Sequence, residues 1–269
     1  MTTDLPVEGR KGHHEDPVLN RSLERGIEIL RAFRPGADLL GNGEIAERTG
    51  LSRATVSRLT QTLVSGGLLQ HDRSQRAYRL APLVLSLAHA MRSGSIAMQV
   101  AAPLMRKTAE HLRINVGLAV PDRDEMVYLE SVRYNKKVAL RSVVAGQRVP
   151  IELTSLGFAY LGSLDKDARE SVLQRISMLR PSSWQEASQQ VDRALTHHEK
   201  HGFCVASWQP EVVAVATPLA VEGLQVLVLN MSLSTSSSMR DVAKEFGPCL
   251  MRLKEEIVAA LDMTGPDGQ

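Results

Sequence analysis

The sequence predicts an α+β fold, in which an N-terminal winged helix-turn-helix domain is joined by a linker helix to a larger C-terminal domain. Three observations support this prediction. The chain has 269 residues, a length that favours two domains over one. Two short helical patterns that meet at Gly50 are followed by the pattern of a β-hairpin. Beyond residue 95, helical segments are interspersed with strand-like runs, as in an α+β domain.

The composition is that of a globular cytoplasmic protein, with 43% hydrophobic and 23% charged residues. No apolar run approaches the roughly 18 residues of a membrane span, and no signal peptide follows Met1. The two cysteines, Cys204 and Cys249, are too few for a disulfide framework. Residues 18–92 contain 11 Arg and no Lys against 6 Asp and Glu. This surplus suits contacts to phosphate and guanine, and a basic solvated surface explains it equally well.

The first 17 residues are polar and predict a disordered tail. A helix is expected in the following stretch, NRSLERGIEILRAF, with Ser22 as its N-cap and Pro35 beyond its end. Its apolar residues recur at helical spacing, at Leu23, Ile27, Leu30 and Phe33. A second, short helix is expected over residues 43–49, with Ile45 facing inward.

A third helix is expected after the turn at Gly50, with Ser52 as its N-cap. Its core-facing stripe consists of Val56, Leu59 and Leu63, which fall within a narrow arc. The opposite side is polar and is made of Ala54, Arg58, Gln61 and Ser65, flanked by Thr55, Ser57 and Thr62. Such a face has the hydrogen-bonding groups and the small size that docking to DNA bases requires.

A two-stranded hairpin is expected next, because LLQHD and AYRLA alternate apolar and polar residues around the turn RSQR. A helix, a turn, a second helix and a hairpin form a winged helix-turn-helix, which we place at residues 18–81. In this arrangement the second helix of the motif enters the major groove of double-stranded DNA. The predicted DNA-binding residues are Arg21, Ser52, Arg53, Ala54, Thr55, Ser57, Arg58, Gln61, Thr62, Arg76 and Tyr78.

The remaining segments predict a linker helix at residues 82–95 and a second domain at residues 96–264. The linker carries an apolar stripe that suits pairing between two copies of the chain. In the second domain, helices are expected over residues 96–113, 154–163, 165–178 and 185–201, and a last one after the serines at 236–238. Strands are expected over residues 115–120, 125–132, 137–144, 202–207, 212–221 and 224–233. Helices around five or six strands can enclose a ligand pocket.

The stretches NRSLERGIEILRAF, GEIAERTGLSRATVSRLTQTLVSGGLLQHD and AYRLAPLVLSLA resemble the N-terminal domain of IclR-type bacterial transcriptional regulators. Two later stretches, GQRVPIELTSLGFAYLGSL and HGFCVASWQPEVVAVATPLAVEGLQVLVLNMSLS, resemble the effector-binding domain of the same family. The resemblance covers residues 18–262. It implies a sequence-specific regulator that binds operator DNA as a homodimer or as a dimer of dimers.

By this resemblance, the second domain is GAF-like and binds a small metabolite, an organic or aromatic acid, whose binding controls the operator. The residues that it implies for effector binding are Arg141, Ser155, Leu156, Gly157, Ala214, Asn230 and Ser232. The chain departs from the family pattern at Glu152, at Phe158, at Ala214, at Asn230 and over residues 207–209. Glu152 disfavours an anion in the pocket unless Arg141 or Arg148 offsets its charge.

The alternative is an enzyme with an appended DNA-binding module, whose active site surrounds Glu152 and Arg141. Neither a GxSxG motif nor a phosphate-binding GxxxxGK[ST] loop occurs, and HHEKH at residues 197–201 is not the HExxH zinc pattern. We therefore predict no enzymatic activity, no catalytic residues, no metal and no cofactor. The effector, the operator and the choice between repression and activation are not encoded in a recognisable motif.

Overall fold

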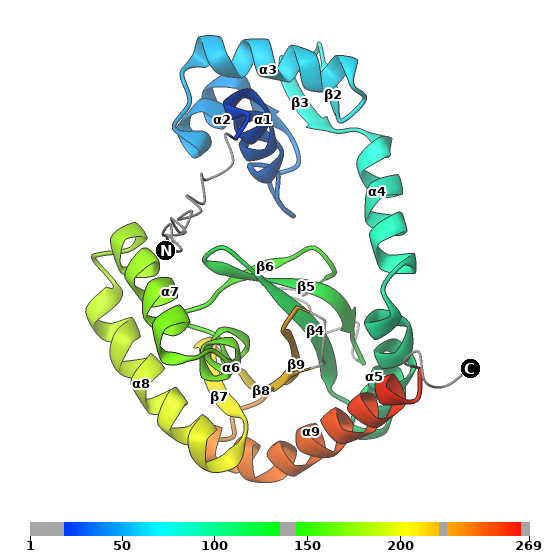
Figure 1. Cartoon of the computed structure of the whole chain (residues 1–269), viewed down its shortest axis with the longest axis vertical. Coiled ribbons are helices and arrows are strands. Elements are labelled where there is room, and N and C mark those ends of the chain that lie inside the picture. The colour runs from blue at the N-terminus through cyan, green and yellow to red at the C-terminus, as the bar shows by residue number, and fades with distance from the viewer. Residues whose placement is uncertain (1–18, 135–143, 221–224, 265–269) are drawn as a thin grey trace, which may run out of the picture. The chain divides into compact units, whose positions relative to one another are not determined.

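The computed structural model describes residues 19–134, 144–220 and 225–264. Within it the chain divides into two compact units, residues 1–84 and residues 85–269 (Figure 1). Helix α4 (Pro82–Ser93) begins in the first unit and continues into the second.

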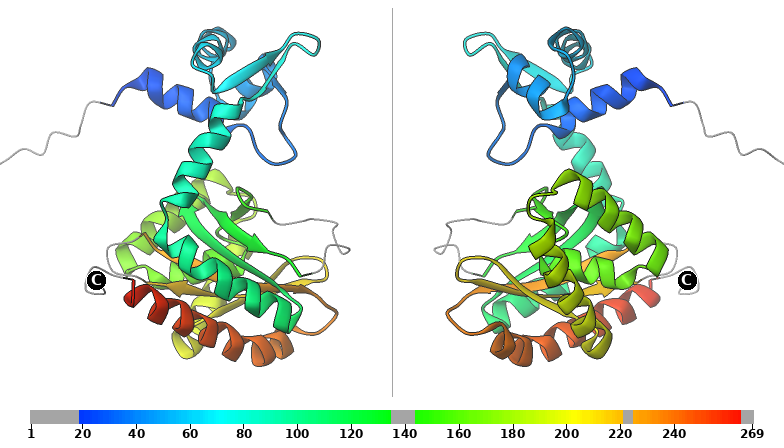
Figure 2. Two further views of the ribbon diagram at one scale, coloured as in Figure 1. Left: turned by 90° about the vertical axis from the view of Figure 1, so that its right-hand side faces the viewer. Right: turned by 90° about the vertical axis from the view of Figure 1, so that its left-hand side faces the viewer.

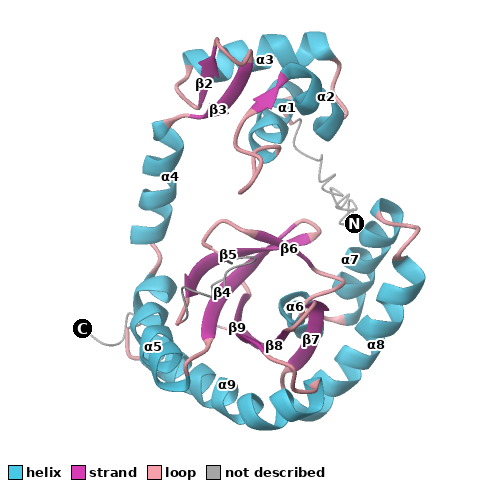
Figure 3. Ribbon diagram, turned by 180° about the vertical axis from the view of Figure 1, so that it is seen from behind, coloured by secondary structure: helices cyan, strands magenta, loops and turns pink. Residues whose placement is uncertain are grey.

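The N-terminal unit contains three helices and a small antiparallel sheet (Figure 3). The helices are α1 (Arg21–Arg31), α2 (Asn42–Thr49) and α3 (Arg53–Ser65). The strands are β1 (Leu40–Gly41), β2 (Leu69–Asp72) and β3 (Ala77–Leu80), in the order β1-β3-β2. The predicted hairpin is confirmed, with Leu69 opposite Leu80, while β1 was not predicted because two residues leave no periodic signal.

The turn between α2 and α3 follows from two local features. Gly50 adopts a left-handed conformation with φ of 68°, which ends α2 and which a residue with a side chain rarely adopts. Ser52 caps α3, because its hydroxyl accepts a hydrogen bond from the Thr55 amide. Val56 and Leu59 are buried as predicted, and they pack with Ile29 of α1 and Ile45 of α2.

Two predictions about α1 are wrong. Asn20, not Ser22, caps the helix, because its side-chain oxygen accepts hydrogen bonds from the amides of Ser22 and Leu23. Leu23 and Ile27 do not pack in the core but are 64% and 42% exposed, and Ile29 is buried instead. The apolar stripe of α1 therefore contains solvent-facing residues that the unit does not cover.

The C-terminal unit is built on one six-stranded sheet in the order β6-β5-β4-β9-β8-β7, in which every neighbouring pair is antiparallel. The strands are β4 (Asn115–Asp122), β5 (Glu125–Val132), β6 (Arg148–Pro150), β7 (Cys204–Gln209), β8 (Val212–Leu219) and β9 (Leu227–Ser234). The helices that follow α4 are α5 (Ile96–Leu112), α6 (Ser155–Ser163), α7 (Lys166–Leu179), α8 (Trp184–His201) and α9 (Met239–Asp262).

The sheet lies between two layers of helices (Figure 2). Helices α5 and α9 pack on the face that carries Leu118, Val215 and Met231. Helices α6, α7 and α8 pack on the other face, against Ala119 and Ala216 among others. The predicted α+β class is confirmed, β6 was missed, and the strand expected over residues 137–144 lies almost wholly outside the described residues. None of the described helices is both long and apolar enough to cross a membrane.

Candidate functional site

The side of α3 opposite the core is polar, and no other described residue of the N-terminal unit buries it. Ala54, Arg58 and Gln61 are exposed, as are Arg53 and Thr62 beside them. Their exposure follows from the burial of Val56, Leu59 and Thr60 on the opposite side, which fixes the rotation of the helix. The predicted helix therefore presents guanidinium and amide groups that suit bidentate hydrogen bonds to guanine and adenine.

Some of the predicted DNA-binding residues have a structural partner in the unit. The Ser52 and Thr55 hydroxyls lie 2.9 Å apart, and the Thr62 hydroxyl donates to the Arg58 carbonyl at 3.3 Å. Ser57 is half-buried, and Arg21 is exposed at the start of α1. Tyr78 differs from all the others, because it is 8% exposed and belongs to the core of the unit.

The wing formed by β2 and β3 carries exposed arginines around a rigid turn. The pKa of Asp72 is lowered because the Ser74 hydroxyl and the amides of Gln75 and Ser74 donate to its carboxylate. Asp72 also pairs with Arg79 of the other strand at 2.6 Å, which ties β2 to β3 next to the turn. Arg76 is exposed near the tip in a left-handed conformation with φ of 51°. The wing therefore presents cationic side chains beside α3, in the same unit.

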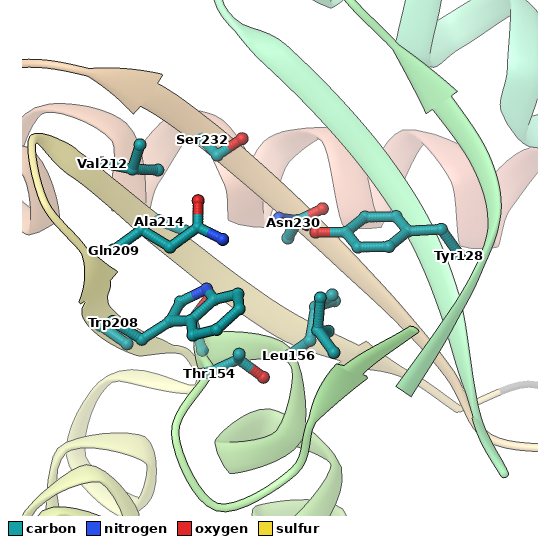
Figure 4. A pocket seen from close by; sticks show the side chains of 12 residues that line it. Tyr128, Thr154, Leu156, Trp208, Gln209, Val212, Ala214, Asn230 and Ser232 are labelled. Atoms are coloured by element: carbon teal, nitrogen blue, oxygen red, sulfur yellow. Dashed lines mark hydrogen bonds between the residues drawn. The ribbon is translucent and has the colours of Figure 1, made fainter. Parts of the chain in front are cut away.

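A pocket lies in the C-terminal unit where the start of α6 meets strands β5, β6, β7, β8 and β9 (Figure 4). Its lining includes five residues that the resemblance had implied, namely Ser155, Leu156, Ala214, Asn230 and Ser232. The other lining residues are Tyr128, Val149, Thr154, Ala206, Trp208, Gln209 and Val212. Among the described residues, the lining thus contains hydroxyl, amide and aromatic groups and no ionised side chain.

The polar groups of the pocket are held in place by their neighbours. The Asn230 amide Nδ2 donates to the Tyr128 hydroxyl at 3.2 Å, and both residues are buried. Burial raises the pKa of Tyr128 to about 12, with the hydrogen bond from Asn230 acting in the opposite direction, so the phenol is neutral at physiological pH. Thr154 caps α6 by accepting from the Gly157 amide at 3.2 Å. Unpaired amides at the start of a helix favour an anionic partner.

One implied effector residue that the structure describes, Gly157, is not part of the lining. Gly157 lies in the first turn of α6 against the backbone of Ile151, so close that a Cβ atom would overlap the Ile151 carbonyl. It permits the close approach of α6 to the preceding loop, which is a packing role. Arg141 lies outside the described residues.

Of the two arginines that the sequence suggested as counter-charges for Glu152, Arg148 pairs with other residues and Arg141 lies outside the described residues. Glu152 is 2% exposed and pairs with Arg180, whose Nη1 lies 3.1 Å from its Oε1. Arg148 instead pairs with Asp122 and Glu125, at 2.6 and 2.7 Å. Arg148 is therefore not the residue that offsets Glu152. The pairing with Arg180 spans 28 positions of the sequence, which no local pattern signals.

Trp208 is one of the seven lining residues that the predicted site lacked. It is 40% exposed, and it lies in β7 where the register with β8 shifts between Ala206 and Gln209. Such a bulge changes the direction in which side chains point, and Figure 4 shows the Trp208 ring beside Thr154 and Gln209. The departure from the family pattern at residues 207–209 was the signal that could have identified it.

Two family models together match most of the chain. The model of the IclR helix-turn-helix domain matches residues 22–73, and the model of the bacterial transcriptional regulator IclR C-terminal domain matches residues 89–261. This chain belongs to the IclR family. It is a transcriptional regulator with an N-terminal DNA-binding domain, as the resemblance had implied.

Several transcriptional regulators are similar to this IclR-family chain over nearly its whole length. It is 32% identical over 253 residues to the HTH-type transcriptional regulator TsaQ1/TsaQ2 of Comamonas testosteroni, across 92% of this chain and 91% of that protein. It is 26% identical to the Pca regulon regulatory protein of Pseudomonas putida, across 90% and 84% of the two chains. The crystal structure of an IclR family transcriptional regulator from Brucella abortus matches with a TM-score of 0.83 at 35% identity, across 96% of each chain.

Proposed function

We propose that this IclR-family regulator binds a specific operator through α3 and that a small organic acid in the pocket of the C-terminal unit controls this binding. The observation that carries the proposal is the exposed face of α3, which contains Arg53, Ala54, Arg58 and Gln61. Arg58 and Gln61 are placed to read base edges, while Arg21, Arg53, Ser57, Thr62 and Arg76 supply phosphate contacts. Ser52 and Thr55 contribute through the capped start of α3, and Tyr78 supports the wing from the core.

The lining of the pocket supports an acid as the effector. The start of α6 offers backbone amides at Ser155 and Leu156, with the Thr154 and Ser155 hydroxyls beside them. A carboxylate bound there gains from the partial positive charge of the helix terminus. Glu152, the nearby acid, pairs with Arg180, which it shares with Asp124, so its charge opposes an anion less than an unpaired carboxylate would. Ala214, Asn230 and Ser232 form the facing wall.

Trp208 supports an effector with a flat, aromatic body. The space between the lining side chains is about 40 Å³, whereas a cavity that accepts benzene measures roughly 150 Å³. An aromatic metabolite therefore needs more room than the described side chains leave. Tyr128, Leu156 and Asn230 are buried, whereas Trp208 is 40% exposed on an edge strand. We infer that the Trp208 ring swings outward to admit the effector and then stacks on it, so that the bound effector presses on the buried wall that Tyr128 forms.

The uncovered apolar residues support a homodimer, or a dimer of dimers, as the form that binds DNA. None of the residues of α4 is buried, and Leu83, Leu87 and Met91 recur along one side of it, at 42%, 55% and 53% exposure. Leu23 and Ile27 on α1 are uncovered in the same way. Exposed apolar stripes of this kind mark protein interfaces. We propose that α4, at residues 82–95 with its flanking turn, links the two domains and pairs between subunits.

A ligand screen tests the effector part of the proposal. Trp184→Phe leaves Trp208 as the sole tryptophan, because the chain has two. Benzoate, 4-hydroxybenzoate and cyclohexanecarboxylate are titrated while the emission of Trp208 and the melting temperature are followed. We expect the aromatic acids to quench Trp208 and raise the melting temperature, and the alicyclic acid to do so more weakly. Equal binding of all three, or binding that leaves Trp208 unquenched, would exclude a stacked aromatic ligand.

We propose that the pocket binds without catalysis and that the protein works in the bacterial cytoplasm, on chromosomal DNA. The support is that the relatives are named as regulators. Prolonged incubation with a bound acid followed by chromatography tests this, since a sensor returns the acid unchanged and an enzyme consumes it.

A further inference from the structure

Helix α4 is fastened to strand β5 by the side chain of Arg92, in the last turn of the helix. Its Nη1 donates to the Leu129 carbonyl at 2.7 Å, and its Nη2 pairs with Glu130 Oε2 at 2.5 Å. The other Glu130 oxygen accepts from the Ser131 amide at 3.1 Å. The guanidinium therefore holds two consecutive residues of β5 at once, through one main-chain and one side-chain acceptor.

The point of attachment is a β-bulge. In the pairing of β4 with β5, Leu118 lies opposite Glu130 and Ala119 lies opposite Tyr128, so Leu129 has no partner on β4. A bulge locally interrupts the ladder and bends its strand, and bulges are frequent beside functional sites. Here Arg92 binds the carbonyl of the extra residue, so the geometry of the bulge and the position of the end of α4 depend on each other.

The residue directly before the bulge is Tyr128, which forms a wall of the pocket. Its ring packs so closely over Gly117 that a Cβ atom there would overlap both Tyr128 and Asn230. Its amide donates to the Gln147 carbonyl at 2.9 Å, and its own carbonyl accepts from the Gly146 amide at 2.8 Å. Gly117 and Asn230 close one side of the ring, so a ligand that pushes the ring toward them also pushes on the backbone of the strands beneath it.

The junction that follows Arg92 is firmly held as well. The Gln99 side chain donates to the Ser93 carbonyl at 2.6 Å, and the Ser95 hydroxyl caps α5 by accepting from the Met98 amide. The connection between α4 and α5 is therefore held by hydrogen bonds, so a shift of the bulge moves the end of α4 and is not absorbed by a flexible loop.

We propose that Arg92 is a positioning residue that transmits a displacement of Tyr128 in the pocket to the end of α4. This inference rests on the proposed function, in which the pocket binds the effector and α4 leads to the DNA-binding domain. In this proposal the bulge adopts two arrangements, one in which Arg92 holds α4 against β5 and one in which these contacts are altered. An effector shifts the balance only as far as it binds one arrangement better than the other.

Hydrogen exchange on the full chain, without effector or DNA, tests the coupling. The pocket is perturbed by Asn230→Ala, which removes the partner of the Tyr128 hydroxyl, and the link is removed by Arg92→Met. We expect Asn230→Ala to speed exchange of the amides at residues 90–95 several-fold. In the Arg92→Met background, where these amides already exchange faster, Asn230→Ala should add nothing, because coupled perturbations are not additive.

Arg106→Met is the matched control, because Arg106 is exposed on α5, and it should leave the effect of Asn230→Ala intact. Reciprocity supplies a second readout, since Arg92→Met should shift the emission of Trp208 in the Trp184→Phe background and Arg106→Met should not. If Arg92→Met does not fold, Glu130→Gln weakens the same contact between α4 and β5 and should give the same non-additivity.

Additive exchange effects, or no change at residues 90–95 on Asn230→Ala, would overturn the role of Arg92. Such a result would leave the proposed function standing, because neither effector nor DNA enters the measurement. Failure of the acids to bind would instead affect the proposed function and not the coupling.

Discussion

Arg180 is expected to stabilise the C-terminal unit beside the pocket, because its ion pairs join the end of α7 to the residues before α6. Its Nη2 pairs with Asp124 Oδ2 at 2.5 Å, and its Nη1 lies 3.1 Å from Glu152 Oε1. Arg180→Met keeps most of the aliphatic stem and removes the charge. Glu152, which is 2% exposed, then keeps a buried carboxylate without a cation.

The expected loss follows from this burial. Removal of one partner from a buried ion pair costs roughly 3–5 kcal/mol. The Arg180 side chain is 32% exposed, so water replaces part of the interaction and we expect the low end, about 3 kcal/mol. For a protein of this size, that loss corresponds to a fall in melting temperature of roughly 6–12 °C.

Thermal and urea unfolding, followed by circular dichroism at neutral pH, measure the effect. Glu152→Gln removes the buried charge, so the double variant should be more stable than the sum of the single losses predicts, by about 1–3 kcal/mol. Arg193→Met, at an exposed position of α8, is the control and should stay within about 0.5 kcal/mol of the original protein. Additive losses, or a loss below about 1 kcal/mol for Arg180→Met, would refute the reasoning.

Three further outcomes are expected. Burial raises the pKa of the Cys204 thiol to about 12, so a thiol reagent should modify Cys249 first, and in Cys249→Ser the remaining thiol should react only as fast as the protein unfolds. Tyr128 has a pKa raised from 10.0 to about 12. The contribution of Tyr128 to the free energy of unfolding should therefore be fully present below about pH 10 and be lost, by roughly 2–3 kcal/mol, as the pH rises to about 12. The free energy of unfolding of Tyr128→Phe should not show this loss over the same pH range. Leu87→Asp on the exposed side of α4 should dissociate the dimer in sedimentation without unfolding the chain, and an unchanged mass would remove α4 from the interface.

Local signals predicted the helix-turn-helix well, because its determinants are adjacent in the sequence. Gly50 and Ser52 mark the turn and the cap by their own chemistry, and the spacing of Val56 and Leu59 sets which side of α3 is exposed. The same periodicity was misleading in α1, where Leu23 faces solvent. A stripe of apolar residues has the same spacing whether it is covered by its own domain or by another chain.

The pocket was only partly predictable, because its geometry depends on contacts between distant segments. The resemblance brought Ser155, Asn230 and Ser232 to attention, and the structure places them together. The pairing of Glu152 with Arg180, and the bulge that directs Trp208, arise from the way the strands and helices pack. No pattern within a short window of sequence carries that information.

The most direct test of the central claim is a selection of DNA sequences from a random double-stranded pool, with the original protein and with Arg58→Ala. A dimer that reads bases through α3 should enrich one motif of two related half-sites, spaced by whole helical turns. Arg58→Ala should still bind but lose the preference at one position of each half-site, at a cost of about 1–3 kcal/mol for the original motif. Enrichment of no motif, or of the same motif with unchanged preference by Arg58→Ala, would contradict the account.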